Sequence, residues 1–149
     1  MSQPNLIEGA IQCQYYVGSI WCFDERHPNA CYVNGQKIQP NFKVSAFIDE
    51  KKTFKNEEVE RVWFKDSEIP KIPKGIGNLF ENLKCLSLNY CKLTEIESSH
   101  LQEMKNLEHL DLDENLLKFI PGDLFRFNKK LENVSFENNE LEEVEGNLF

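Results

Sequence analysis

No long apolar run occurs in the 149 residues, and no hydrophobic stretch approaches the roughly 18 residues that a transmembrane helix needs. The first residues, Met1-Ser2-Gln3-Pro4, also lack the basic start and apolar stretch of a secretory signal. We therefore expect neither a transmembrane segment nor a signal peptide in this chain. Because 40% of its residues are hydrophobic, the chain can form one domain with its own core.

Basic residues are the minority among the charged ones. The chain has 17 lysines and arginines against 25 aspartates and glutamates, for a formal net charge of -8. From Leu83 onward there are 14 acidic and seven basic residues, a balance of -7. A nucleic-acid surface needs a clustered basic stripe, and the sequence has none, so no nucleic-acid partner is expected. The acidic residues either keep the protein in solution or meet a basic partner.

Metal ligands are also sparse. Only three histidines occur, and His27 and His100 stand apart from other ligand types. The group Asp111, Asp113 and Glu114 lacks the loop of closely spaced oxygens with a turn glycine that a calcium site uses. We predict no metal site and no cofactor.

The sequence does contain a pattern with a period of 24 residues. It is apolar at its first, fourth, sixth, eleventh and fourteenth positions, and its four copies begin at Val59, Leu83, Leu107 and Leu131. Apolar residues at the fourth and sixth positions fit a short strand with one buried face. The third, fifth and seventh positions then point away from the core. A single unit buries too little apolar surface, whereas stacked units share one continuous core.

The ninth position of each unit has a structural interpretation. An amide there can bond backbone groups of neighbouring turns at the point where the chain leaves the strand. Its four occupants are Ser67, Cys91, Asn115 and Asn139.

The pattern resembles the leucine-rich repeat family, whose signature is L-x-x-L-x-L-x-x-N/C-x-L. The signature is carried by Leu83 to Leu93, Leu107 to Leu117 and Leu131 to Leu141, with a weaker match from Val59 to Ile69. The 24-residue length, with Ile-Pro pairs beginning at Ile72 and Ile120 and phenylalanines at 125 and 149, looks like the extracellular type of repeat.

This resemblance implies a curved right-handed α/β-type solenoid with a parallel sheet on its concave face. We expect repeats at residues 59–82, 83–106, 107–130 and 131–149, the last incomplete, preceded by a β cap at residues 1–58. The unfinished last unit has no closing cap. It indicates a fragment, a truncated product, or an end that associates with a partner.

The front segment does not follow the repeat and reads as short strands joined by turns. Strand-forming residues occupy 11–15, 20–23, 30–33 and 43–48, and Asn34-Gly35 is a turn signal. The segment is similar to the cysteine-containing caps of secreted arthropod leucine-rich repeat proteins. That similarity implies a disulfide between Cys13 and Cys31, although Cys22 leaves a Cys22–Cys31 pair open.

The other two cysteines have different expected roles. Cys91 is expected to be a buried structural thiol, because the family signature accepts cysteine at the ninth position. Cys85 is either free or paired with Cys22. Five cysteines leave at least one unpaired or bonded to another chain.

The strand positions that point away from the core predict a binding surface on the concave face. The predicted binding residues are Arg61, Trp63, Lys65, Ser87, Asn89, Tyr90, His109, Asp111, Asp113, Asn133, Ser135 and Glu137. Trp63 and Tyr90 have the composition of interface anchors. Trp63 has a second interpretation, as a core residue covered by the cap.

Two further features fall on the same face. Cys85, His109 and Asn133 occupy the third position of successive repeats and resemble a cysteine hydrolase's side chains, but an open sheet offers no oxyanion hole or cleft. Asn133-Val134-Ser135 is a glycosylation sequon.

The function that the family resemblance implies is a non-catalytic extracellular module that binds an unknown protein or glycan through its concave face. The alternatives are a fragment of a receptor ectodomain and a cysteine-dependent enzyme.

Overall fold

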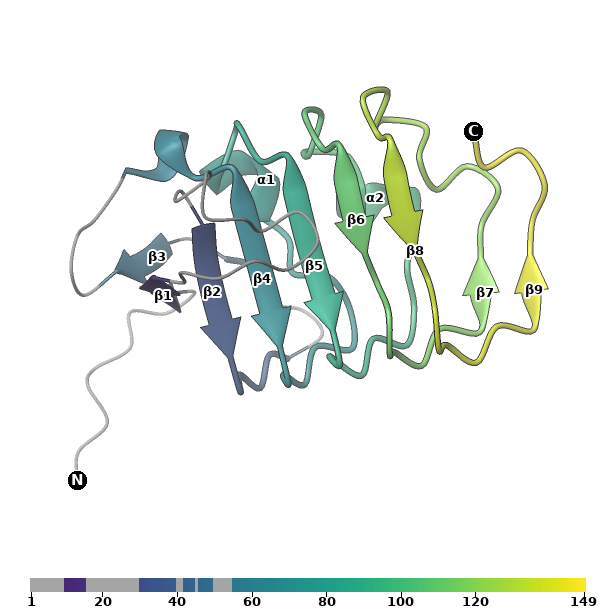
Figure 1. The fold of residues 1–149 in the computed structure, drawn as a ribbon, viewed down its shortest axis with the longest axis horizontal. Coiled ribbons are helices and arrows are strands. Elements are labelled where there is room, and N and C mark those ends of the chain that lie inside the picture. Colours follow the sequence, from purple (N-terminus) through teal and green to yellow (C-terminus); the bar gives the residue numbers. More distant parts are fainter. Residues whose placement is uncertain (1–9, 16–29, 40–41, 45, 50–54) are drawn as a thin grey trace.

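The structure is a computed structural model that describes residues 10–15, 30–39, 42–44, 46–49 and 55–149. Successive turns of the chain each contribute one short strand to a common sheet (Figure 1), in the order β3-β1-β2-β4-β5-β6-β8. The strands of this sheet are β1 (Ala10–Tyr15), β2 (Ala30–Asn34), β3 (Ala46–Asp49), β4 (Arg61–Lys65), β5 (Cys85–Asn89), β6 (His109–Asp111) and β8 (Asn133–Ser135).

The strands β2, β4, β5, β6 and β8 are parallel and in register. Val62 pairs with Leu86, Leu86 with Leu110, and Leu110 with Val134. Equivalent positions of successive 24-residue units therefore lie side by side. The result is a parallel-strand solenoid of stacked turns, as the period predicts.

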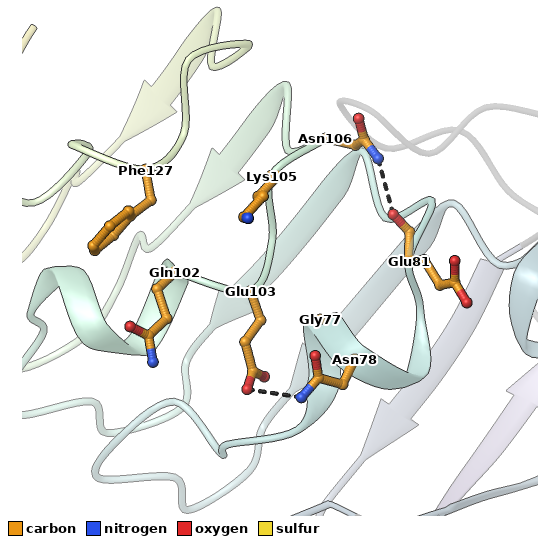
Figure 2. Close-up of a pocket in the computed structure, with 8 residues that line it drawn as sticks. All are labelled: Gly77, Asn78, Glu81, Gln102, Glu103, Lys105, Asn106 and Phe127. Atoms are coloured by element: carbon orange, nitrogen blue, oxygen red, sulfur yellow. Dashed lines mark hydrogen bonds between the residues drawn. The ribbon is translucent and has the colours of Figure 1, made fainter.

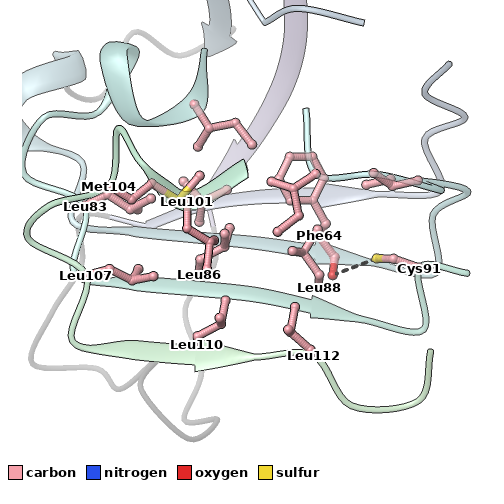
Figure 3. Packing of buried hydrophobic residues seen from close by; sticks show 14 of the residues in the cluster. Phe64, Leu83, Leu86, Leu88, Cys91, Leu101, Met104, Leu107, Leu110 and Leu112 are labelled. Atoms are coloured by element: carbon pink, nitrogen blue, oxygen red, sulfur yellow. Dashed lines mark hydrogen bonds between the residues drawn. The ribbon is translucent and has the colours of Figure 1, made fainter. Parts of the chain in front are cut away.

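The core consists of the apolar positions of the repeat. In the repeats that contain β4, β5 and β6 the fourth and sixth positions point inward, and residues such as Phe64, Leu86 and Leu110 are completely buried (Figure 3). Each buried side chain of this size stabilises the fold by about 1.5–3 kcal/mol relative to exposure. The alternation of buried and outward positions therefore fixes which strand face becomes the core.

The ninth positions hold adjacent turns together through polar contacts. Asn115 Oδ1 accepts hydrogen bonds from the backbone N–H groups of Cys91 and Leu93, both at 3.0 Å, and its Nδ2 donates to the carbonyl oxygens of Leu88 and Leu112. Asn139, Cys91 and Ser67 also bond backbone groups. The Cys91 Sγ–H, for example, points to the Phe64 carbonyl oxygen (Figure 3).

The short helices α1 (Ile76–Leu79) and α2 (Ser98–Leu101) lie behind the sheet (Figure 1). A 3-10 helix η1 (Asn56–Glu58) precedes β4, and a two-stranded parallel sheet of β7 (Phe119–Ile120) and β9 (Glu143–Val144) lies beyond β8 in the same view.

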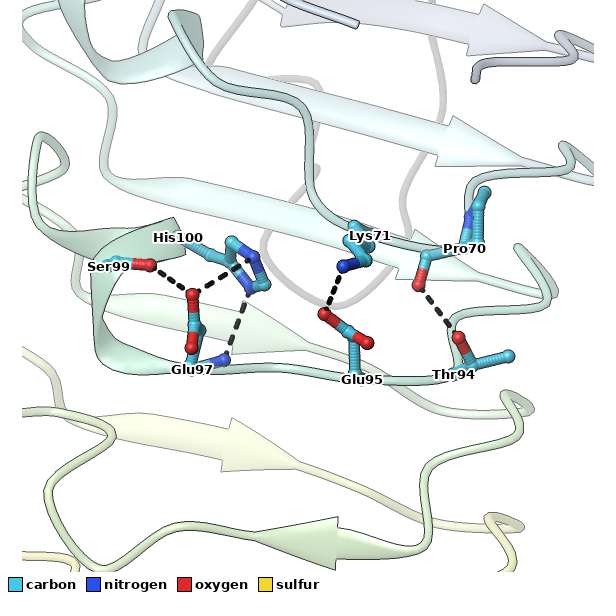
Figure 4. A network of polar contacts seen from close by, with 7 residues as sticks. All are labelled: Pro70, Lys71, Thr94, Glu95, Glu97, Ser99 and His100. Atoms are coloured by element: carbon cyan, nitrogen blue, oxygen red, sulfur yellow. Dashed lines mark hydrogen bonds and ion pairs between the residues drawn. The ribbon is translucent and has the colours of Figure 1, made fainter. Parts of the chain in front are cut away.

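Polar contacts also link neighbouring turns outside the core (Figure 4). Lys71 Nζ lies 2.6 Å from Glu95 Oε1, and Thr94 Oγ1 donates to the Pro70 carbonyl oxygen at 3.2 Å. Just before α2, the Glu97 N–H donates to His100 Nδ1 on that helix, and burial lowers the pKa of His100. Exposed ion pairs of this kind contribute only about 0–1 kcal/mol, so they supplement the core.

The N-terminal strands cover the first repeat. Strand β1 pairs antiparallel with β2 and parallel with β3. Cys13 and Cys31 form a disulfide with a Cα–Cα distance of 5.2 Å, which is the pairing that the resemblance implies. The strand expected at Ile20–Phe23, together with Cys22 and His27, lies outside the described residues.

Strand β2 is also the first turn of the solenoid. It pairs with β4 over five residues, from Ala30 opposite Arg61 to Asn34 opposite Lys65, and beyond it the Ile38 N–H donates to the Glu68 carbonyl oxygen. The offset between these turns is 31 residues, so a search for a 24-residue period does not find it. The parallel array therefore reaches into the segment that the sequence assigned to the cap.

Within the described ranges, no helix has the length and apolar character that crossing a bilayer requires.

Candidate functional site

The concave face is the side of the parallel sheet opposite the core. The strand register aligns the predicted binding positions in columns. Arg61, Cys85, His109 and Asn133 form one column, and Trp63, Ser87, Asp111 and Ser135 form the next. The repeat therefore predicted these columns, but it did not predict how accessible their members are.

The part of the concave face next to the cap is buried. Trp63 is only 5% exposed; its ring centroid lies 4.8 Å from that of Tyr32, and it packs in one cluster with Ala30 and Cys85. Arg61 is buried too, with its Nη1 atom 3.5 Å from Glu60 Oε2. Arg61 and Trp63 were predicted as binding residues; both are buried, and for Trp63 this favours the second interpretation, a residue covered by the cap. The pairing of β2 with β4 places Tyr32 beside Trp63, and Trp63 is buried in a small apolar cluster that is separate from the main core.

The middle of the face is occupied by an internal polar network. Ser87 Oγ lies 2.9 Å from Asp111 Oδ2, and Asp111 Oδ1 accepts the Asp113 N–H at 3.0 Å. Asp113 in turn accepts hydrogen bonds from the Ser135 hydroxyl and the Glu137 N–H. Burial raises the pKa of Asp111. Ser87 and Asp111, also predicted as binding residues, are buried and hydrogen-bonded within the protein, so they are not part of the accessible surface.

The row of Cys85, His109 and Asn133 does form, and Asn133 Nδ2 lies 3.0 Å from His109 Nδ1. Cys85, however, is disulfide-bonded. Its sulfur is therefore not a thiolate, and the cysteine-dependent alternative loses its nucleophile. Among the described cysteines only Cys91 is free, and burial raises its pKa to about 12, as expected of a structural thiol.

The remaining predicted residues are accessible to different degrees. Tyr90, Asn133 and Glu137 are exposed. The half-buried residues are Lys65, Asn89, His109, Asp113 and Ser135. The accessible residues therefore lie at the strand ends and on the later repeats. Asn133, the first residue of the sequon, is exposed on β8. A glycan at Asn133 stays a prediction.

The eighth position of every repeat has a left-handed backbone. Its φ angles are 49° at Asp66, 52° at Tyr90, 55° at Glu114 and 54° at Asn138, and the aligned Gly35, which follows β2, has a φ of 63°. Glycine, asparagine and aspartate accept this conformation readily, whereas a bulky side chain there is a genuine outlier. Tyr90 is the one aromatic residue in the column, and it is 53% exposed.

A groove lies beside Tyr90, where the strands end. This edge groove has a volume of about 350 Å3. It is lined by Asp66, Glu68, Tyr90, Lys92, Glu114 and Leu116, with Ser67 among them. Leu116 is 40% exposed. The sequence identified Tyr90 but missed Leu116. The available signal was that Leu116 holds a position occupied by Glu68, Lys92 and Glu140 in the other repeats.

A second, polar pocket lies at the opposite ends of the strands (Figure 2). It has a volume of about 620 Å3 and is lined by residues including Glu81, Gln102, Lys105 and Phe127. Asn106 Nδ2 donates to the Glu81 carbonyl oxygen at 2.9 Å, and Asn78 Nδ2 donates to Glu103 Oε1 at 2.8 Å. Both hydrogen bonds join adjacent turns, so these two asparagine side chains stabilise the stacking of the repeats.

No group of three or more metal-ligating side chains comes together in the described part of the chain.

The stacked parallel turns, and the hydrogen bonds that the ninth-position residues make between them, define a leucine-rich repeat solenoid. The family model described as "Leucine rich repeat" matches residues 81–141. Leucine-rich repeat domains are typically protein–protein interaction modules.

A solved structure described as the "APL1 leucine-rich repeat domain" has a similar fold, with a TM-score of 0.52 and 23% sequence identity. The match covers 77% of this chain and 36% of that one, so the chain spans about a third of the length of that domain. No curated protein matches the sequence at a significant level.

Proposed function

We propose that this chain is a non-catalytic protein-binding module whose contact surface is the accessible edge of its concave face, centred on Tyr90. The observation that carries the proposal is the side chain itself. Tyr90 exposes half of an aromatic surface from a backbone conformation that disfavours it, with a φ of 52°. Its equivalents in the other repeats are Asp66, Glu114 and Asn138, so the fold does not require an aromatic residue there.

Backbone strain of this kind costs on the order of 1–3 kcal/mol and is characteristic of ligand contacts and switch regions. Exposed tyrosines are also enriched among the residues that dominate interface energies. With Trp63 buried, Tyr90 is the aromatic anchor that this part of the face offers.

Photo-crosslinking from position 90 tests this proposal. Tyr90 is replaced by a photoreactive phenylalanine, and the purified protein is irradiated in extracellular fluid of the source tissue. We expect a discrete crosslinked protein that unlabelled wild-type chain competes away and Tyr90→Asn does not.

Phe119 provides the control. It is 42% exposed but lies on β7, in the separate two-stranded sheet. The same photoreactive group at position 119 should not capture that protein. Equal capture from both positions, or equal competition by Tyr90→Asn, would refute the proposed surface.

We also propose that the module acts in an oxidising, extracellular compartment. The supporting observations are the Cys13–Cys31 disulfide and the disulfide-bonded Cys85, because such bonds persist outside the cytosol. Peptide mapping of protein from its native source should recover the Cys13–Cys31 linkage without added oxidant. Recovery of both cysteines as free thiols would contradict the proposal.

A further inference from the structure

We infer that the edge groove binds a polypeptide segment that presents a basic side chain next to an apolar one. The inference rests on the proposed function and adds the chemistry of the partner. It draws on two exceptions to the repeat, on the charges around them, and on the groove that contains both.

The first exception is Tyr90, an aromatic residue in a column otherwise made of Asp66, Glu114 and Asn138. The second is Leu116, an apolar residue in the tenth-position column, where the other repeats have Glu68, Lys92 and Glu140. Both exceptions line the same groove, from adjacent repeats, and are 53% and 40% exposed. These two residues, at neighbouring solvent-facing positions where the other repeats have polar residues, give the groove an apolar centre that the repeat does not need.

Carboxylates lie on both sides of that centre. Asp66 and Glu114 flank Tyr90 in the eighth-position column, and with strands about 4.8 Å apart their Cα atoms are separated by about 10 Å. Neither has an ion-pair partner among the described residues; Glu114 Oε1 accepts a hydrogen bond from Asn138 Nδ2 at 2.7 Å. The groove therefore has negative charge available to a ligand on each side of Tyr90.

The one lysine that lines the groove is already paired. Lys92 Nζ lies 2.9 Å from Glu68 Oε1, and this contact lowers the pKa of Glu68. The positive charge that would attract an anionic ligand is thus neutralised locally. A partner with lysine or arginine beside an apolar side chain would contact the apolar centre and also meet Asp66 and Glu114. A second copy of this chain is a poor occupant, because each copy has a net charge of -8.

A random 12-residue peptide library displayed on phage supplies a defined probe. The library is selected against the intact, oxidised protein, and enriched peptides are synthesised and their affinities measured. We expect enriched peptides to share an arginine or lysine adjacent to an apolar residue. Their affinity should fall at least tenfold with Glu114→Lys and with Leu116→Lys.

Glu81→Lys is the matched control. It makes the same charge change on an exposed glutamate at the opposite ends of the strands (Figure 2), so it corrects for general attraction of basic peptides to an acidic protein. We expect the affinity for Glu81→Lys to remain within about twofold of wild type.

Two results would overturn the inference, and they can be told apart. Enriched peptides that lose affinity with Tyr90→Asn but show no basic preference would refute the partner chemistry and leave the proposed surface standing. Basic peptides that bind Tyr90→Asn, Glu114→Lys and Glu81→Lys equally would refute both.

Discussion

At the scale of single residues, Tyr90 has two effects of opposite sign: its strained backbone lowers stability, and its exposed ring supplies the proposed binding contact. Its left-handed backbone is unfavourable for a bulky side chain, so replacement by a residue that accepts positive φ should stabilise the fold. We expect Tyr90→Asn to raise the free energy of unfolding by about 1 kcal/mol, as measured by denaturant titration. Tyr90→Ala keeps most of the backbone strain and should not show this gain. A Tyr90→Asn variant less stable than Tyr90→Ala would contradict the strain argument.

Asn115 is the residue-scale counterpart inside the core. Replacement by alanine leaves the N–H groups of Cys91 and Leu93 and the carbonyl of Leu88 without their side-chain partner. Several buried groups left unsatisfied should lower the free energy of unfolding by about 3 kcal/mol or more.

Asn82 is a control for Asn115. Its Nδ2 atom also donates to a backbone carbonyl of the preceding turn, that of Glu57 at 2.9 Å, but this bond is exposed. Asn82→Ala should cost less than about 1 kcal/mol. Equal losses of unfolding free energy in the two variants would mean that burial does not determine how much these asparagine hydrogen bonds stabilise the fold.

At the scale of elements, the join between the cap and the first repeat depends on a close backbone approach. The Val44 N–H donates to the Lys74 carbonyl oxygen at 2.8 Å, and a Cβ atom at Gly75 would collide with the Val44 carbonyl oxygen. Gly75 also has a φ of 94°, a conformation that disfavours other residues. This glycine allows the cap to pack directly before helix α1.

Gly75→Ala should therefore destabilise the protein through both strain and collision. Gly35 separates the two effects, because it has a φ of 63° but no atom within 4 Å of its added Cβ. Gly35→Ala should cost only the strain, about 1–2 kcal/mol, and Gly75→Ala clearly more. Thermal unfolding of the two variants gives the comparison. Equal costs would show that the cap yields to the extra methyl group.

The elements also show what the sequence could and could not predict. The period placed strands β4, β5, β6 and β8 and assigned Asn115 its role, because those properties depend on local spacing. It did not predict that β2 is a turn of the array, since that turn is offset by 31 residues. Trp63 is buried because Tyr32 of β2 lies beside it, so the sequence alone left both interpretations of Trp63 open. The exposure of Tyr90 and Leu116 in one groove depends on how adjacent turns stack.

At the scale of the whole molecule, burial differs between the two ends of the solenoid. Cys31 and Val33 at the cap end are completely buried, as are Leu110 and Leu112 in the third repeat. The last turn is more open, with Leu141 37% and Val144 50% exposed. Association with a partner through this last turn, which the sequence suggested, stays a prediction. Sedimentation would test it.

The stability of stacked repeats is approximately a sum over neighbouring turns, so a turn covered on one side should open before a turn covered on both. We expect amide hydrogen exchange to be slowest in β4 and β5 and fastest in β8 and β9, as measured by mass spectrometry of peptic peptides. Val134→Ala should then speed exchange in the last turn alone, whereas Leu110→Ala should speed it on both sides of β6. Uniform protection in wild-type protein would instead show that the array unfolds as one cooperative unit, in which the open turn is as stable as the covered ones.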